Sequence, residues 1–96
     1  MSLNRYARRR DANERTIIDT LRAHGAVVYQ LDSPADLLVG YRQRWYLLEV
    51  KDGAKPPSAR ALTMAEAQVE LACRIDRLPY AVISSAAEAL QAIGAT

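Results

Sequence analysis

The stretch WYLLEVK at residues 45–51 decides how this chain folds. Successive side chains of a strand point to opposite faces, so Glu49 and Lys51 share one face and Val50 takes the other. Both faces of the preceding residues are apolar, which predicts a strand that is buried on both sides. A carboxylate and an ammonium at the end of such a strand are costly to desolvate, and pairing alone seldom justifies them. They therefore mark a candidate functional site.

A second carboxylate, Asp36, opens the apolar run 36–39. The segment 40–44 reverses the chain direction, so the two runs are expected to pair as an antiparallel hairpin that brings Asp36, Glu49 and Lys51 together. Two carboxylates supply the oxygen ligands that a divalent metal requires, and a neighbouring lysine can orient or activate a water. The pattern predicts metal-dependent hydrolysis of a phosphodiester. Two simpler interpretations remain open, in which Asp36 caps a turn and Glu49 with Lys51 forms an ion pair at a sheet edge.

The rest of the chain predicts the order αβββαβα, an α/β fold with a mixed sheet flanked by helices. Thr63 and Glu66 have the spacing of a capping box, and Gly25 is expected just after the end of the first helix. The helices are expected at 11–24, about 63–77 and 86–93, the strands at 26–31, 36–39, 45–51 and 79–83, and a loop at 52–62. We expect one domain over residues 1–96, with residues 1–10 as a basic N-terminal arm.

Two further polar residues are predicted to face the core. Glu14 precedes Ile17, Ile18 and Leu21 at helical spacing, although a glutamate in a first turn is also favoured by the helix dipole alone. Gln68 lies on the stripe formed by Met64, Leu71, Ala72 and Ile75, where it either joins the site or makes a structural hydrogen bond.

Composition narrows the classes of function. The 96 residues include one cysteine and one histidine, which excludes an internal disulfide and a zinc site built from Cys and His ligands. No apolar run approaches the ~20 residues of a membrane span, and no signal-peptide pattern opens the chain. We therefore expect a cytoplasmic protein with no membrane partner and no organic cofactor.

Positive charge is concentrated in the part of the chain that carries the candidate site. Residues 1–60 hold eleven Lys or Arg against seven Asp or Glu, whereas residues 61–96 hold two against four. This asymmetry favours binding of a polyanionic substrate such as DNA, although basic segments also keep proteins soluble. The candidate contacts to phosphates are Arg8, Arg9, Arg10, Arg42, Arg44, Lys55 and Arg60.

The chain resembles the PD-(D/E)xK nuclease superfamily at Glu14, Pro34-Ala35-Asp36, Glu49-Val50-Lys51 and Gln68. It is most similar in type to the small Holliday-junction-resolvase and VRR-NUC proteins that phages and prophages often encode. The expected element order also matches the restriction-endonuclease-like αβββαβ core of that superfamily. One departure is Ala35, which separates the proline from the aspartate.

The resemblance implies a Mg²⁺- or Mn²⁺-dependent DNA endonuclease that prefers branched or junction DNA and acts as a homodimer. It implies that Asp36, Glu49, Glu14 and the Val50 carbonyl bind the metal, that Lys51 positions the attacking water and that Gln68 supports the site. The competing interpretations are a non-catalytic DNA-binding accessory protein that keeps the nuclease fold, and a small interaction protein that binds no metal.

Overall fold

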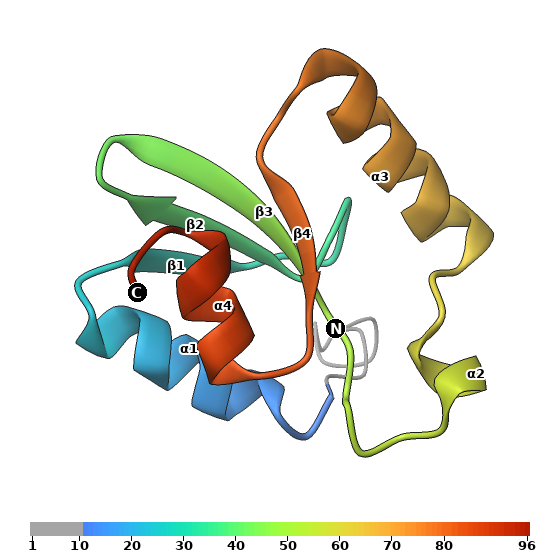
Figure 1. Cartoon of the computed structure of the whole chain (residues 1–96), viewed down its shortest axis with the longest axis horizontal. Helices are drawn as coiled ribbons and strands as arrows, with labels where there is room; N and C mark the ends of the chain where they lie inside the picture. The colour runs from blue at the N-terminus through green and yellow to red at the C-terminus, as the bar shows by residue number, and fades with distance from the viewer. Residues whose placement is uncertain (1–10) are drawn as a thin grey trace, which may run out of the picture.

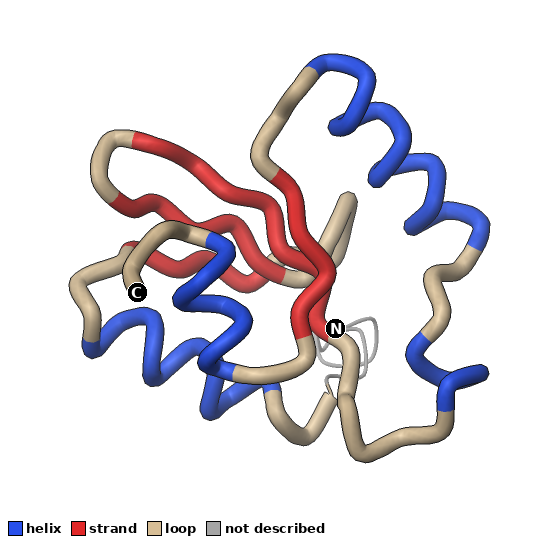
Figure 2. Tube along the Cα trace, in the orientation of Figure 1, coloured by secondary structure: helices blue, strands red, loops and turns tan. Residues whose placement is uncertain are grey.

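A computed structural model describes residues 11–96, which form an α/β fold around one four-stranded mixed sheet (Figures 1 and 2). The strands lie in the order β1-β2-β3-β4, with β1 and β2 antiparallel, β2 and β3 antiparallel, and β3 and β4 parallel. This confirms the predicted hairpin and the mixed sheet. The strands are β1 (Val27–Gln30), β2 (Leu37–Tyr41), β3 (Arg44–Val50) and β4 (Tyr80–Ile83).

The helices divide unequally over the two faces of the sheet. They are α1 (Glu14–Ala23), α2 (Pro57–Arg60), α3 (Met64–Asp76) and α4 (Ala86–Ala92). Figure 1 shows α1 and α4 together on one face, while α3 lies across β4 on the other side. Within residues 11–96, no helix combines the length and apolar character needed to cross a membrane.

The hydrophobic core lies between the sheet and the helix pair α1 and α4. Alternate strand residues point into it, because side chains of a strand alternate between faces. Helix α1 contributes three residues at helical spacing, and Glu14 is buried on the same face. The core residues of the strands and these helices include Val28, Leu37, Val39, Leu48, Val50, Ile83, Ile17, Ile18, Leu21, Ala89, Leu90 and Ile93.

The predicted capping box and the glycine after the first helix are confirmed, whereas α1 begins at Glu14 and not at the expected residue 11. Glu66 donates its backbone N–H to Thr63 Oγ1 at 3.2 Å and accepts the Thr63 N–H at 2.9 Å, which completes the capping box of α3. Helix α1 ends at the cap residue His24, and Gly25 follows with φ of +88°, a conformation that glycine adopts without steric cost.

Three expectations from the sequence are wrong. Strand β3 is buried on both sides only near its C-terminal end, and Trp45 is half exposed because α3 covers the second face of the sheet only in part. The predicted loop 52–62 contains the short helix α2. The apolar stripe of α3 faces away from the sheet, and Cys73 is instead the buried residue of that helix.

Candidate functional site

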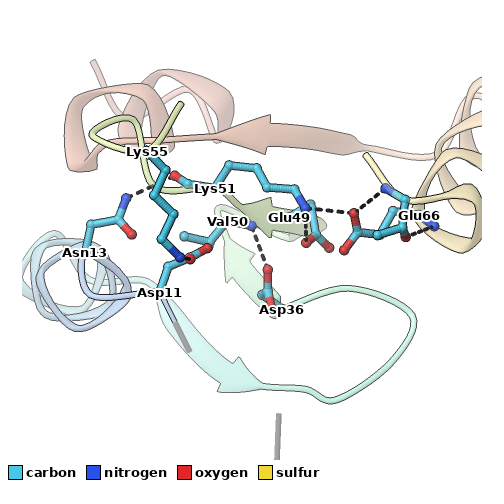
Figure 3. A network of polar contacts seen from close by, with 9 residues as sticks. Asp11, Asn13, Asp36, Glu49, Val50, Lys51, Lys55 and Glu66 are labelled. Atoms are coloured by element: carbon cyan, nitrogen blue, oxygen red, sulfur yellow. Dashed lines mark hydrogen bonds and ion pairs between the residues drawn. The ribbon is translucent and has the colours of Figure 1, made fainter. Parts of the chain in front are cut away.

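The hairpin brings Asp36 next to the end of β3. Leu37 pairs with Leu48, so Asp36, one residue before Leu37, comes level with the residues that follow Leu48. The Val50 N–H donates a hydrogen bond of 2.8 Å to Asp36 Oδ2 (Figure 3). Asp36 and Glu49 are 4 % and 2 % exposed, so both carboxylates are buried at the meeting point of β2 and β3.

Lys51 lies between two carboxylates. Its Nζ is 3.7 Å from Glu49 Oε2 and 2.7 Å from Glu66 Oε1, and the side chain is largely shielded from solvent (Figure 3). The same Glu66 oxygen accepts the N–H of Thr63 in the capping box. The N-terminus of α3 therefore holds the lysine at the end of β3.

The electrostatics of this cluster perturb three pKa values. Burial, followed by the hydrogen bond and charge of Asp36 and the nearby Glu66, raises the pKa of Glu49 to about 8. Burial alone would lower the pKa of Lys51, but the hydrogen bond and charge of Glu66 and the charge of Glu49 raise it overall. Burial opposes ionisation of Glu66, yet its bonds to Lys51 and Thr63 lower its pKa overall. Lys51 therefore carries a positive charge at neutral pH.

Burial and the charge of Glu49 also raise the pKa of Tyr80, at the start of β4, to about 12. Tyr80 therefore stays neutral throughout the physiological pH range. Among residues 11–96, no hydrogen-bond partner is recorded for its buried hydroxyl.

Glu14 lies at the same end of the sheet, on the first turn of α1. It is buried, and its Oε2 accepts a hydrogen bond of 3.2 Å from Gln30 Nε2 at the end of β1. Together with Asp11 and Arg22, these residues line a cavity of about 330 Å³. The prediction that Glu14 faces inward is confirmed, while its participation in metal binding stays a prediction.

Asn13 is a member of this region that the sequence did not single out. Its Nδ2 donates to the backbone oxygens of Lys51 at 3.1 Å and Ser84 at 2.8 Å. These bonds connect the start of α1 to the ends of β3 and β4 and so fix the position of Glu14. The signal was weak because asparagine before a helix is usually read as a cap residue, and here its side chain makes no cap hydrogen bond.

Gln68 does not face the core as predicted, because it is exposed on the outer side of α3. Glu66, one half-turn earlier, is the residue of α3 that contacts Lys51. The capping-box pattern identified Glu66 correctly as N3, but its contact with the lysine depends on where β3 ends in space.

Among residues 11–96, the predicted phosphate contacts fall into two groups at opposite ends of β3. Lys55 follows β3, and its Nζ pairs with Asp11 Oδ1 at 2.8 Å close to the candidate site (Figure 3). Arg60 lies on α2, in the same loop region. Arg42 and Arg44 flank the turn at the other end of β3, ~20 Å away for a strand of this length. Arg8, Arg9 and Arg10 lie outside the described residues.

The donor set suits a hard divalent cation. Asp36 and Glu49 are buried neighbours, and their mutual repulsion, which contributes to the raised pKa of Glu49, is the kind that a cation relieves. Within residues 11–96, however, no group of three or more His, Cys, Asp or Glu side chains is already arranged to hold a metal ion.

Comparisons with family models, curated proteins and solved structures found no match for this chain.

Proposed function

We propose that this protein is a metal-dependent endodeoxyribonuclease that hydrolyses phosphodiester bonds in DNA. The observation that carries the proposal is the convergence of Asp36, Glu49 and Lys51 where β2 begins and β3 ends. Two buried carboxylates beside a lysine that stays protonated are costly for stability, which favours a chemical role for them.

The architecture supports the same proposal. The chain follows the order of the restriction-endonuclease-like core, with helix α1, the three antiparallel strands β1 to β3, helix α3 and the parallel strand β4. We propose that the α/β fold is of this type, with the site at the end of the sheet where that core carries its carboxylates. The resemblance lies in Glu14, Asp36, Glu49 and Lys51.

Lys51 acts in this mechanism as a fixed positive charge. Its raised pKa keeps the ammonium protonated, so it donates hydrogen bonds instead of accepting a proton. It can orient the attacking water and stabilise the negative charge that develops on the phosphorane oxygens. Glu66 acts through Lys51 as a positioning residue, because it holds the ammonium at 2.7 Å.

Asp36, Glu49 and the backbone carbonyl of Val50 would hold Mg²⁺ or Mn²⁺, with Glu14 supporting the site. A bound cation would supply Lewis-acid polarisation of the phosphate and activation of water. The carboxyl group of Glu49 must lose its proton to bind a cation. Its raised pKa therefore couples metal binding to the release of a proton.

The proposed substrate is inferred from the basic residues near the site and from the family resemblance. The basic residues near the site, Lys55 and Arg60, can contact phosphates but carry no base-reading pattern. We propose selection by DNA structure, with branched or junction DNA as the preferred substrate and the cytoplasm as the place of action.

The experiment that tests this proposal is cleavage of a labelled four-way junction and a matched linear duplex with Mg²⁺, with Mn²⁺ and with chelator. Wild-type protein is compared with Glu49→Gln, which keeps the shape of the side chain and removes its charge. Metal-dependent cleavage that the variant lacks would support the nuclease, and the preference between substrates would show whether it acts on junctions. Absence of cleavage with both metals would reject the nuclease proposal.

One observation favours the non-catalytic DNA-binding accessory protein as the second candidate. The ion pair of Lys51 with Glu66, and the proton that Glu49 keeps up to about pH 8, already neutralise much of the carboxylate cluster without a metal. Binding of the junction without cleavage, unchanged in Glu49→Gln, is the result expected for this candidate.

A further inference from the structure

The side of the sheet that faces away from α1 and α4 is exposed near the turn between β2 and β3. In residues 11–96, the helix on this side, α3, packs against β4, at the edge of the sheet opposite β1 (Figure 1). Val27, Tyr29 and Trp45 are 51 %, 55 % and 53 % exposed. Val27 and Trp45 both pair with Gly40, so their side chains adjoin. Exposed apolar side chains gathered in this way commonly mark an interaction site.

The indole ring of Trp45 lies with one face on the glycine of the neighbouring strand. A Cβ at residue 40 would be 3.0 Å from Cζ3 of Trp45 and 3.3 Å from both Cε3 and Cη2. A point so nearly equidistant from three adjacent ring atoms lies over the face of the ring and not at its edge. Gly40 has no side chain and so allows this approach. Tyr29 restrains the ring from the side, with the centroids 6.2 Å apart. One face of the indole thus packs on β2, and the other faces solvent.

Two arginines lie beside this ring. Arg42 and Arg44 line an open cavity of about 380 Å³ with Trp45. Within residues 11–96, no acidic side chain lines this cavity, and neither arginine forms a salt bridge. Arg42 and Gln43 have φ of +48° and +71°, a turn that favours asparagine and glycine. The turn therefore carries a guanidinium where its own geometry favours a smaller residue.

On the side toward α3, Trp45 lines an apolar groove of about 220 Å³ with Leu38, Leu47 and Leu78. The ring thus stands between an apolar groove and a basic cavity. A ligand that suits both has a flat apolar ring joined to an anionic group, which is the chemistry of a nucleotide. Bases stack on aromatic side chains, and arginines contact the phosphates that join them.

A base that stacks on this ring must be unpaired. In a duplex each base lies between its neighbours and presents only its edges in the grooves. The indole is held flat on the sheet by Gly40, so it can stack only on a base whose face is free. Such stacking reads no sequence, because every base has a face.

We propose that this surface binds single-stranded DNA. A base stacks on the exposed face of Trp45, and Arg42 and Arg44 bind the phosphates next to it. Trp45 and Glu49 point to the same side of β3 and lie ~13 Å apart along it, so a bound strand can extend toward the carboxylates. The choice of DNA rests on the proposed function, whereas the stacking residue and both arginines take no part in the proposed catalysis.

The test uses Trp45 itself, which is the single tryptophan of the chain. The full chain is titrated at low salt, with EDTA and without metal, with a short oligo(dT) strand and with the duplex of that strand and oligo(dA). We expect the single strand to quench the emission of Trp45 by stacking on it. The duplex should leave the emission nearly unchanged, because its bases are not free to stack.

Fluorescence anisotropy of a labelled oligo(dT) separates the two kinds of contact. Trp45→Ala should raise the dissociation constant about tenfold or more, and Trp45→Phe, which keeps an aromatic ring, should recover much of the affinity. Arg44→Gln should weaken binding several-fold and reduce its dependence on salt. Arg74→Gln removes the same charge from the exposed surface of α3 and is the matched control, with unchanged affinity.

Circular dichroism establishes that each variant is folded, and Arg44→Gln keeps the proposal testable if Trp45→Ala unfolds. The proposal is overturned if the single strand leaves the emission unchanged or if the duplex quenches it equally. Affinity that neither Trp45→Ala nor Arg44→Gln lowers would also overturn it. Because metal is absent, these results do not depend on cleavage, and a failure to stack would leave the proposed nuclease site unaffected.

Discussion

The ammonium of Lys51 lies 2.7 Å from Oε1 of Glu66, and the same oxygen accepts the N–H of Thr63 that begins α3. One carboxylate oxygen thus joins the capping box of a helix to the lysine at the end of β3. Because both bonds end on one atom, the position of α3 and the position of Lys51 are coupled. This relationship leads to the first prediction.

Glu66→Gln should lower the free energy of unfolding by about 1–3 kcal/mol, because it replaces a charge-assisted bond to a shielded ammonium by a neutral one. Glu66→Ala should cost about 1 kcal/mol more, because it also removes the capping box. Urea unfolding measures both. The matched control is Glu70→Gln. Glu70 pairs with the exposed Arg74 at 3.7 Å, so its replacement should change the free energy of unfolding by less than about 1 kcal/mol. Equal effects at both positions would contradict the coupling.

The stability of the protein should fall as pH rises from about 4.5 to about 8. The pKa of Glu49 is raised from 4.5 to about 8 by burial and by Asp36, so the folded state keeps a proton that the unfolded state releases in this window. The linkage is up to about 1.4 kcal/mol for each pH unit. Unfolding by urea across this range checks the slope, and Glu49→Gln should flatten it. A difference between the two proteins that does not change with pH would show that the pKa of Glu49 is not raised.

Mg²⁺ or Mn²⁺ should raise the midpoint of thermal unfolding at pH 8, where Glu49 is ready to lose its proton. A ligand that binds only the folded state stabilises it by mass action, by about 2.7 kcal/mol at a concentration one hundred times the dissociation constant. Glu49→Gln should lose this stabilisation, while Asp52→Asn, in the exposed turn after β3, should retain it. Equal stabilisation of both variants would place the cation elsewhere.

Lys51→Met should abolish DNA cleavage and leave DNA binding within a few-fold of wild type, because it removes a charge that acts on the transition state. Methionine fills a volume similar to that of lysine, although the substitution removes the ammonium that Glu49 and Glu66 share. Arg74→Met is the control, because its ion pair with Glu70 lies on the exposed surface of α3 and its loss should leave cleavage unchanged. Cleavage that survives in Lys51→Met would remove this lysine from the mechanism.

Asn13→Ala should reduce the free energy of unfolding by about 1–3 kcal/mol, because the backbone oxygens of Lys51 and Ser84 lose their side-chain donor. Calorimetry of this variant beside Asp19→Ala gives the comparison. Asp19 pairs with Arg15 on the exposed face of α1, so its loss should change stability by less than about 1 kcal/mol. If both variants behave alike, the Asn13 bonds do not hold α1 in place.

The local elements could be predicted because their signals are local. The capping box of Thr63 and Glu66, the glycine after α1 and the hairpin before Trp45 each depend on residues a few positions apart. The placement of Asp36 opposite the end of β3 followed from the hairpin register alone. The core charges Glu14, Asp36 and Glu49 were therefore found in advance.

The orientation of α3 could not be predicted in this way. Its apolar stripe has the periodicity of a buried face, and periodicity reports which residues share a face without reporting what covers it. The chain buries the side that carries Cys73 instead, and on that side Glu66 contacts Lys51. Gln68, which was expected in the core, is therefore exposed at the surface.

The sequence by itself determined the order of the helices and strands other than α2, the buried carboxylates and the lysine beside them, because alternation in strands and capping at helix ends act over a few residues. Only the tertiary structure decided that Glu66 holds Lys51, that Asn13 ties α1 to the ends of β3 and β4, and that α3 shows its apolar side to solvent. These contacts join residues far apart in the chain or depend on how separate elements pack. Their geometry follows from the packing of the whole sheet and its helices.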